Sequence, residues 1–300
     1  MSIATAPSVT TRSSQRIDTQ RTTRKKRGRS IGVAVLTTAL LVVVAFPLVW
    51  LFLGSLKTQQ EFLDNPAFAL PENFFNFENY TRALTEGNLA TYARNSVIAV
   101  VPSLFLTIFL GVCAGFALEV MVWKGRGTVL LMFLAGIMVP GQLILLPLFT
   151  IYFRAGLTGS LWPLIITYTA VGLPLTTFMM ATFFRSVPRE LLEAATLDGA
   201  STLRAFFSIA LPLVRNAVFT IALVQFFFMW NDLLVALTFT NSDALRTIQV
   251  GLLGFQGQFG QVEYGPTMAA ISLNVAGTLL IYLFLNKRMM AGLTAGSVKG

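Results

Sequence analysis

Six long apolar segments are the feature that most constrains the fold of this chain. They cover approximately residues 31–55, 96–122, 128–153, 161–184, 212–238 and 267–286. A helix needs about 20 mostly apolar residues to cross the hydrocarbon core of a bilayer, and each segment is long enough. Composition agrees, because 55% of the residues are hydrophobic and only 12% are charged, whereas about 25% are charged in a typical soluble domain. The sequence therefore predicts an all-α integral membrane protein with six transmembrane helices.

The distribution of the basic residues predicts how these spans are oriented. If the N-terminus is cytoplasmic, 17 of the 22 Lys and Arg residues lie inside, and five lie outside: Lys57, Arg82, Arg94, Arg154 and Arg246. This asymmetry is what the positive-inside rule requires, and the opposite orientation would invert it. The net charge of +9 therefore indicates topology, with both termini in the cytoplasm, and gives no reason to expect nucleic-acid binding.

The remaining segments complete the expected organisation. Residues 1–30 are rich in Ser, Thr and Arg and lack apolar periodicity, so we expect a disordered basic cytoplasmic tail near the anionic leaflet. The apolar stretch at 31–55 is too long for the core of a secretory signal and predicts an anchoring helix. An extracytoplasmic loop follows at 56–94, then a core of five spans at 95–286 and a cytoplasmic tail at 287–300.

The residue inventory excludes several kinds of chemistry. The sequence has no histidine and a single cysteine, Cys113, so it offers neither a Ser-His-Asp triad nor a disulfide framework nor a typical zinc site. It has no GxxxxGK[ST] phosphate-binding loop. No pair of titratable residues suited to acid and base roles is evident. We therefore expect no enzymatic activity and no cofactor or metal in this chain, and any ATP must be bound by another chain.

Few polar residues lie within the spans. Asp232, in QFFFMWNDLL (225–234), is the one acid placed well inside a span. Intramembrane acids tend to face a protein interior or a watery cavity, so Asp232 could line a pathway; equally, it could form an interhelical hydrogen bond that only fastens the bundle. Glu119 lies near the cytoplasmic end of its span, where we expect it to pair locally with Lys124 or Arg126.

Small residues and prolines shape the spans. Gly111 and Gly115 have the GxxxG spacing that lets two helices approach closely, which favours a packing role. Prolines in the third and fourth spans remove backbone donors and predict kinks, which are compatible with a pathway or with ordinary bundle irregularity. These prolines are Pro140, Pro147, Pro163 and Pro174.

Outside the membrane, the loop at 239–266 contains GLLGFQGQFGQVEYG, which favours a flexible, aromatic-containing contact surface.

One polar stretch, EAATLDGASTLRAFFSIALP (193–212), interrupts the apolar pattern on the cytoplasmic side. From Pro188 onward the sequence predicts a short helix, because Pro suits the first turn and Glu190 and Glu193 favour the positive end of the helix dipole. Gly199 can adopt a positive φ and end this helix.

A second short helix should follow. Ser201 can cap it, and an apolar stripe lies along one face at helical spacing: Leu203, Phe206, Phe207, Ala210 and Leu211. Pro212 marks the bend into the fifth span. The region from about 188 to 212 is therefore predicted to be a helix–turn–helix elbow on the cytoplasmic surface.

The elbow carries a family resemblance. Its pattern, EAA, three residues, Gly199, nine residues and then Ile209-x-Leu211-Pro212, resembles the EAA loop of bacterial ABC importer permeases at every defined position. In that family the loop forms a coupling helix that fits a groove of the ATPase subunit. The resemblance implies a docking arm and turn made of Glu193, Ala194, Ala195 and Gly199, with Ile209, Leu211 and Pro212 anchoring the elbow at the membrane.

Other segments extend the resemblance to the MalG-type, carbohydrate-uptake branch of this binding-protein-dependent transport family. They are YARNS (92–96), PGQLILLPLF (140–149), WND (230–232) and GLTAGSVKG (292–300). This resemblance implies a permease in the bacterial cytoplasmic membrane that imports a sugar or oligosaccharide by alternating access. Its expected partners are a second, homologous permease subunit, two ATPase subunits that bind ATP and Mg, and an extracytoplasmic substrate-binding protein.

The resemblance also indicates site residues. We expect Gln142, Trp230, Asn231 and Asp232 to line the substrate pathway, and Phe255, Gln256, Gly257 and Phe259 to contact the binding protein. Two alternatives stay open: an ABC permease for glycerol phosphate, an osmolyte or a peptide, and a secondary transporter, for which only Asp232 offers a coupling charge.

Overall fold

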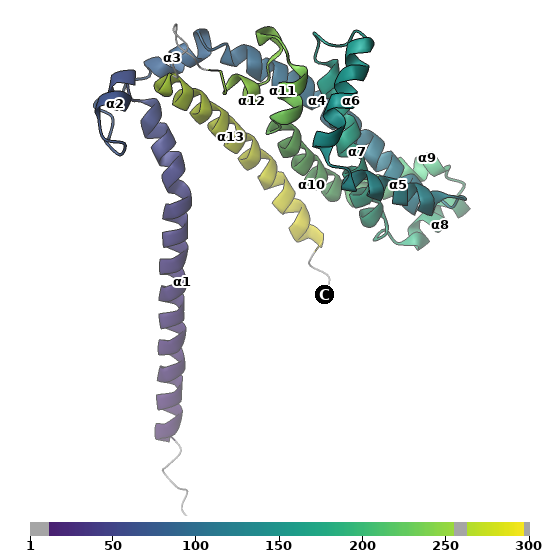
Figure 1. Cartoon of the computed structure of the whole chain (residues 1–300). Coiled ribbons are helices and arrows are strands. Elements are labelled where there is room, and N and C mark those ends of the chain that lie inside the picture. Colours follow the sequence, from purple (N-terminus) through teal and green to yellow (C-terminus); the bar gives the residue numbers. More distant parts are fainter. Residues whose placement is uncertain (1–11, 255–262, 297–300) are drawn as a thin grey trace, which may run out of the picture.

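The computed structural model describes residues 12–254 and 263–296, and within them the chain is helical with no β-strand. Figure 1 shows the arrangement of the helices. In chain order the elements are α1 (Arg12–Ser55), α2 (Gln59–Asp64), α3 (Glu78–Thr85), α4 (Leu89–Glu119), α5 (Arg126–Met138), α6 (Gly141–Arg154), α7 (Trp162–Phe184), α8 (Arg189–Leu197), α9 (Thr202–Ala205), the π-helical turn η2 (Phe206–Ala210), α10 (Leu211–Trp230), α11 (Leu234–Phe239), the 3-10 turn η3 (Asp243–Leu245), α12 (Ile248–Gly251) and α13 (Tyr264–Gly296).

Five helical segments in the described part of the chain are long and apolar enough to cross a membrane, and a sixth is reached if the bent pair α5 and α6 is counted as one span. The sequence predicted one continuous third span at 128–153. That continuity is wrong, because α5 and α6 meet at an angle of 96°. Pro140 stands at the N-cap of α6 with extended backbone, and proline has no N–H to continue the ladder of α5. The expected fifth span at 212–238 also breaks, since α10 ends at Trp230 and α11 begins at Leu234.

Helix α1 differs most from expectation. The predicted disordered tail at 1–30 is wrong for residues 12–30, because α1 continues without a break from Arg12 through the first span. No proline interrupts it before Pro47, Arg, Lys and Gln are good helix formers, and extending an existing helix needs no new nucleus. Figure 1 shows α1 standing apart from the bundle and meeting α13 only near its outer end. The membrane-spanning part, Val33–Ser55, buries none of its most apolar window.

Helices α4 and α7 form the centre of the bundle and pack through small residues. A Cβ built on Gly115 would lie 2.6 Å from the Cβ of Met180 and 2.9 Å from the backbone nitrogen of Ala181. Gly111 is equally tight against Thr176. The predicted packing role of this glycine pair is therefore confirmed, since any side chain here would force the two backbones apart.

An outer layer of short helices covers one end of the spans, the end that the distribution of basic residues predicts to be extracytoplasmic. The expected loop at 56–94 contains α2, α3 and the first turn of α4. The part of the expected flexible loop that the structure describes, 239–254, is held by side chains of α4. Asn95 donates to the carbonyls of Ala244 and Arg246 at 2.8 and 3.0 Å, the Ile248 N–H donates to Ser96 Oγ at 2.9 Å, and the Tyr92 hydroxyl donates to Asp243 at 2.6 Å. The YARNS segment thus fixes the layer, and flexibility was the wrong expectation for these residues.

The corner between α1 and α2 contains a buried cation. Lys57 is 2% exposed, and its ammonium lies 5.1 Å from the ring of Trp50 and 5.6 Å from that of Phe62. Aromatic faces stabilise a cation in this position by cation–π attraction. Asn79 of α3 donates to the carbonyls of Ser55 and Lys57, both at 2.8 Å. These contacts attach the end of α1 to the outer layer.

Candidate functional site

The first arm of the elbow is helix α8, which follows Pro188 and ends in a hydrogen-bonded turn. The Ala200 N–H donates to the Ala195 carbonyl at 2.9 Å, and the Gly199 N–H donates to the Thr196 carbonyl at 3.0 Å. This pair of bonds is a Schellman motif, which needs a left-handed residue at its centre. Gly199 supplies it with φ of +82°. The predicted glycine turn is confirmed.

The second arm is composed of α9 and η2. Ser201 caps it as predicted, since its hydroxyl accepts from the Arg204 N–H at 3.3 Å. The predicted apolar stripe is wrong in part: Phe206 is 5% exposed and Ala210 is buried, but Leu203 and Phe207 are 68% and 52% exposed. The π-helical turn explains the difference, because its i→i+5 bond from the Leu211 N–H to the Phe206 carbonyl places an extra residue in the turn. Spacing based on an α-helix then assigns residues to the wrong face.

The motif residues divide between surface and interior. Glu193, Ala194 and Gly199 are exposed, whereas Ala195 faces the interior. The anchor residues Ile209 and Leu211 are half-buried, while Pro212 is exposed in the first turn of α10. Leu197, at the tip of the first arm, is 88% exposed. The elbow therefore presents a small, partly apolar surface that no described residue of this chain covers.

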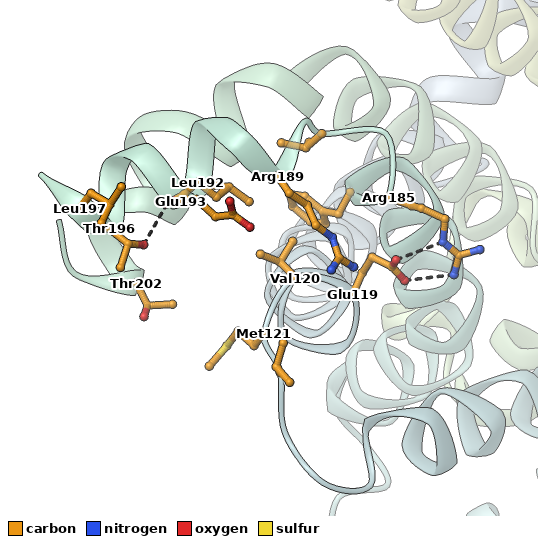
Figure 2. Close-up of a pocket in the computed structure, with 13 residues that line it drawn as sticks. Glu119, Val120, Met121, Arg185, Arg189, Leu192, Glu193, Thr196, Leu197 and Thr202 are labelled. Carbon is orange, nitrogen blue, oxygen red and sulfur yellow. Dashed lines mark hydrogen bonds and ion pairs between the residues drawn. The ribbon is translucent and has the colours of Figure 1, made fainter. Parts of the chain in front are cut away.

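An open groove of about 830 Å³ lies between the first arm and the C-terminal end of α4. Figure 2 shows Glu119 and Arg185 facing each other at its rim, with Glu193 and Arg189 nearby. Arg185 Nε and Nη2 bind the two carboxylate oxygens of Glu119 at 3.1 and 3.0 Å. The hydrogen bonds and charge of Glu119 raise the pKa of the Arg185 guanidinium above its ordinary value.

This ion pair corrects the expected partners of Glu119. Arg126 is near it in sequence, but Arg126 Nη1 donates to backbone carbonyls, those of Met121 at 3.0 Å and of Glu119 at 3.5 Å, and not to the Glu119 carboxylate. Arg185 comes from α7, 66 positions further along the chain. Local spacing alone therefore gave the wrong pairing.

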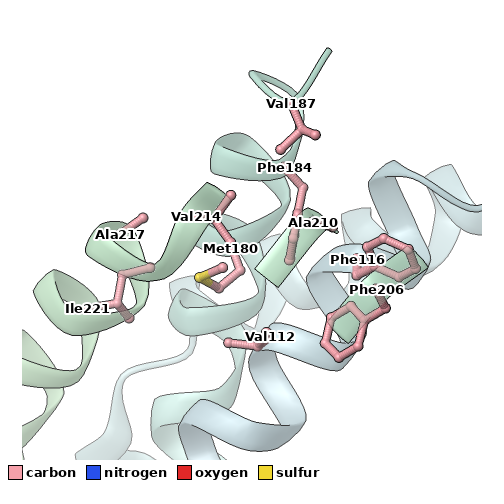
Figure 3. Packing of buried hydrophobic residues seen from close by; sticks show 10 residues of the cluster. All are labelled: Val112, Phe116, Met180, Phe184, Val187, Phe206, Ala210, Val214, Ala217 and Ile221. Carbon is pink, nitrogen blue, oxygen red and sulfur yellow. The ribbon is translucent and has the colours of Figure 1, made fainter. Parts of the chain in front are cut away.

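A buried aromatic cluster connects the second arm to the spans. Figure 3 shows Phe116 of α4 and Phe206 of η2 side by side, with Phe184 of α7 and Ala210 close by. The rings of Phe116 and Phe206 are 4.9 Å apart, and those of Phe116 and Phe184 are 5.5 Å apart. Burial of these rings stabilises the contact of the elbow with α4 and α7.

A second cavity, of about 310 Å³, lies where the two broken spans meet. Its wall includes Gly136 and Val139 beside the α5–α6 break, Asp232 in the α10–α11 break, and Tyr168 and Gln225. The Tyr168 hydroxyl and the Ala236 N–H both donate to Asp232 Oδ2 at 3.0 Å. Non-helical backbone at membrane depth is tolerated where it is buried in protein or lines a water-filled cavity, and the two breaks share this cavity.

The other expected pathway residues do not line this cavity. Gln142 is exposed on the first turn of α6, and Asn231 is exposed and donates to the Phe227 carbonyl at 3.0 Å. Trp230 stacks on Phe226 with ring centroids 5.5 Å apart. Of the four candidates, only Asp232 is part of the cavity wall.

The polar cavity residue Tyr168 was missed by sequence reasoning. Tyr168 lies in an apolar helix without any motif, so no local signal marked it. Gln225, the first residue of the QFFFMWNDLL segment, is buried and donates to the Gly172 carbonyl at 3.0 Å and to Thr176 at 2.9 Å, which ties α10 to α7. The candidate binding-protein residues Phe255, Gln256, Gly257 and Phe259 lie outside the described residues.

The comparisons with known proteins agree on the class. Residues 107–289 match the family described as binding-protein-dependent transport system inner membrane component, and the chain belongs to this family. It is 34% identical over 259 residues to the diacetylchitobiose uptake system permease protein NgcG of Streptomyces coelicolor, which covers 86% of this chain and 85% of that protein. It is 31% identical over 261 residues to the trehalose/maltose transport system permease protein MalG of Thermococcus litoralis, with coverage of 86% and 93%.

A solved structure has the same fold. It is the crystal structure of a bacterial ABC transporter involved in the import of the acidic polysaccharide alginate, with a TM-score of 0.75, 20% identity, and coverage of 88% of this chain and 97% of that one. The chain is therefore an integral membrane permease subunit, whose fold is that of ABC importer permeases, and it is not itself an enzyme.

Proposed function

We propose that this chain is the permease subunit of an ATP-binding-cassette importer that moves a sugar or oligosaccharide into the cell. The observation that carries the proposal is the elbow, whose EAA arm is exposed and closed by the Schellman turn at Gly199. The sugar class is supported by the names of relatives that match most of the chain, including those for diacetylchitobiose and for trehalose and maltose.

In this proposal the chain works in an assembly. Two ATPase subunits bind ATP and Mg and contact the arm formed by Glu193, Ala194, Ala195 and Gly199, while Ile209, Leu211 and Pro212 hold the elbow at the membrane. A second permease subunit completes the pathway, and an extracytoplasmic binding protein delivers the sugar. Both termini are cytoplasmic, as the distribution of basic residues favours. ATP on the inside and the loaded binding protein outside prefer different conformations, which drives alternating access.

We assign a stretch of the substrate pathway to the cavity at Asp232. Breaks in membrane helices often coincide with binding sites near the middle of the bilayer, and this cavity lies between two of them. A carboxylate fixed by Tyr168 and the Ala236 N–H can accept hydrogen bonds from sugar hydroxyls. Polar solute groups would find few other charged partners among the spans.

The first experiment asks whether the chain works with an ATPase. The chain is expressed with its neighbouring genes, purified through a tag on this subunit and reconstituted into liposomes. We expect an ATPase to co-purify, and a cysteine placed at position 193 or 197 to crosslink to it in a Cys113→Ser background. Absence of both the ATPase and the crosslink would remove the importer assignment.

The second experiment identifies the solute. The binding protein is tested against diacetylchitobiose, trehalose and maltose by calorimetry, and ATP-driven uptake of the bound sugar is then measured. Uptake that needs both ATP and the binding protein supports the proposal. Uptake driven by an ion gradient without ATP would indicate a secondary transporter, and binding restricted to osmolytes, glycerol phosphate or peptides would remove the sugar assignment.

A further inference from the structure

Only one membrane span, α10, is directly continuous with the second arm of the elbow. Helices α4 and α7 are the central pair of the bundle, and α7 carries Tyr168 of the cavity at Asp232. A movement of the elbow reaches α4 only through non-covalent contacts. Two of the contacts that the structure shows lie outside the defined positions of the EAA motif.

The first contact is the ring of Phe206, which is 5% exposed and lies 4.9 Å from the ring of Phe116 and 6.4 Å from that of Phe184. Phe206 is the first residue of the π-helical turn, and both it and Ala210, four positions later, belong to the buried cluster. Close packing of this kind transmits displacement because protein interiors have little free volume.

The second contact is the ion pair of Glu119 and Arg185. Arg185 is the C-cap of α7, and only residues 186–188 separate it from the first arm. Glu119 is the last residue of α4 and is 15% exposed, whereas the Arg185 side chain is 67% exposed. The two-point contact fixes the relative orientation of the helix ends, although an exposed pair adds little to stability. Its geometry therefore points to alignment of α4 with the base of the elbow.

We propose that Phe206 and the Glu119–Arg185 pair are positioning residues that make α4 and α7 follow the elbow when it moves. This inference rests on the proposed function, because it concerns how the elbow drives the spans. Phe206 joins the second arm to both helices, and the ion pair joins the end of α4 to the root of the first arm. Together they form a contiguous network beside the covalent path through α10.

The test uses the complete transporter in liposomes, with the binding protein loaded with whichever of diacetylchitobiose, trehalose and maltose it binds. Two rates are measured, ATP hydrolysis and sugar uptake, and their ratio gives sugars imported per ATP hydrolysed. The variants are Arg185→Glu, Glu119→Arg and the double exchange. We expect each single variant to lower the ratio about fivefold, within the range for residues of coupling networks, and the double exchange to restore it to within about twofold.

Matched controls separate coupling from general damage. Lys124→Glu reverses a charge at the same end of the molecule, where Lys124 is exposed and outside the ion pair; it should leave the ratio unchanged. Phe206→Leu should lower the ratio, whereas Leu203→Ala, at a side chain of the same arm that is 68% exposed, should not. Gel filtration checks that each complex is assembled. If a charge reversal prevents assembly, Arg185→Gln and Glu119→Gln replace it.

Single variants with a normal ratio, or a double exchange that fails to restore it, would overturn the role of the ion pair. A normal ratio in Phe206→Leu would overturn the role of the ring. Either result leaves the proposed function intact as long as the wild-type complex imports sugar in an ATP-dependent manner. A wild-type complex that shows no ATP-driven uptake would instead count against the importer assignment itself.

Discussion

The Tyr168 hydroxyl donates a hydrogen bond of 3.0 Å to Oδ2 of Asp232, joining α7 to the break between α10 and α11. The same oxygen accepts the Ala236 N–H at 3.0 Å. Both roles weighed for this acid from the sequence are therefore compatible with the structure: it makes an interhelical bond, and it lines a cavity. Experiments on Asp232 and Tyr168 can separate the two roles.

Asp232→Asn should slow transport more than it disturbs assembly. An asparagine oxygen can still accept the bonds from Tyr168 and Ala236, so the break in the helix keeps its support, but the charge is lost. We expect uptake to fall about tenfold, as for the loss of one hydrogen bond to a charged group, with an unchanged yield of complex in gel filtration.

Asn231→Ala is the control, because Asn231 is exposed and bonds only locally, to the Phe227 carbonyl; both uptake and yield should stay normal. Tyr168→Phe tests the interhelical bond itself. If Asp232→Asn instead dissociates the complex, fastening of the bundle is the main role of this acid.

Gly199→Val should uncouple transport while leaving the chain inserted in the membrane. The φ of +82° is unfavourable for a β-branched residue, at a cost of about 1 kcal/mol or more. Nothing lies within 4 Å of an added Cβ, so strain is the whole effect. ATP hydrolysis and sugar uptake are measured together, and uptake should fall more.

Gly127→Val is the matched control, since Gly127 has equal space but no positive φ. Asparagine tolerates a left-handed conformation better than valine does, so Gly199→Asn should retain more activity. Equal, undiminished uptake in all three variants would show that the turn is not needed for coupling.

Gly115→Val should destabilise the bundle itself. The new Cβ would meet Met180 at 2.6 Å and the backbone of Ala181 at 2.9 Å, and backbone cannot move aside as a flexible side chain can. Overpacking of this kind costs about 1–3 kcal/mol. Thermal unfolding of the detergent-solubilised subunit should show a lower midpoint. Gly277→Val, in a span but with nothing within 4 Å, should not lower it.

Glu61 should stabilise the outer layer in a pH-dependent way. Its carboxylate accepts the N–H groups of Glu72 at 2.7 Å and of Thr58 at 2.6 Å, completing a capping box at the start of α2. Burial alone would raise the pKa of Glu61, but these hydrogen bonds and nearby Lys57 hold it below the ordinary value of 4.5. Because the folded pKa is lowered, the stabilisation is present above the ordinary pKa and is lost as the pH falls through the folded value.

Glu61→Gln should therefore lower the unfolding midpoint near neutral pH, by the equivalent of about 1 kcal/mol, because the charge is lost and the one amide oxygen can replace only one of the two accepting carboxylate oxygens. The difference from wild type should shrink as the pH falls below about 4. Glu78→Gln, at an exposed acid of the first turn of α3, is the control and should show no such trend. A difference that grows toward low pH would contradict the assigned direction.

Local chemistry in the sequence was sufficient for the elbow but not for its packing. Gly199 and Ser201 were predictable because a left-handed turn and an N-cap depend on one residue and its immediate neighbours. Phe206 and Phe207 were assigned to one face, because no feature of the sequence predicts a π-helical turn. Arg185 was missed as the partner of Glu119 because that contact depends on how α4 and α7 cross.

For the membrane spans too, local features could be predicted from the sequence and packing contacts could not. The number of spans follows from length and hydrophobicity, and Pro140 marks an interruption. The angle of 96° does not follow, because it depends on what the two halves pack against. Asp232 was recognisable as an unusual acid, but Tyr168 lies 64 positions earlier in an unremarkable apolar segment. The contacts that define the cavity are long-range, and they cannot be predicted from a single sequence.

The bonds from Tyr92, Asn95 and Ser96 to residues 243–248 also have a consequence for biosynthesis. Each connects groups about 150 positions apart in the chain. During translation the polar end of α4 is made well before its partners exist, and it must stay hydrated until the last fifth of the chain arrives. A chain truncated before residue 243 would leave these groups unsatisfied, so the outer surface can mature only after synthesis is nearly complete.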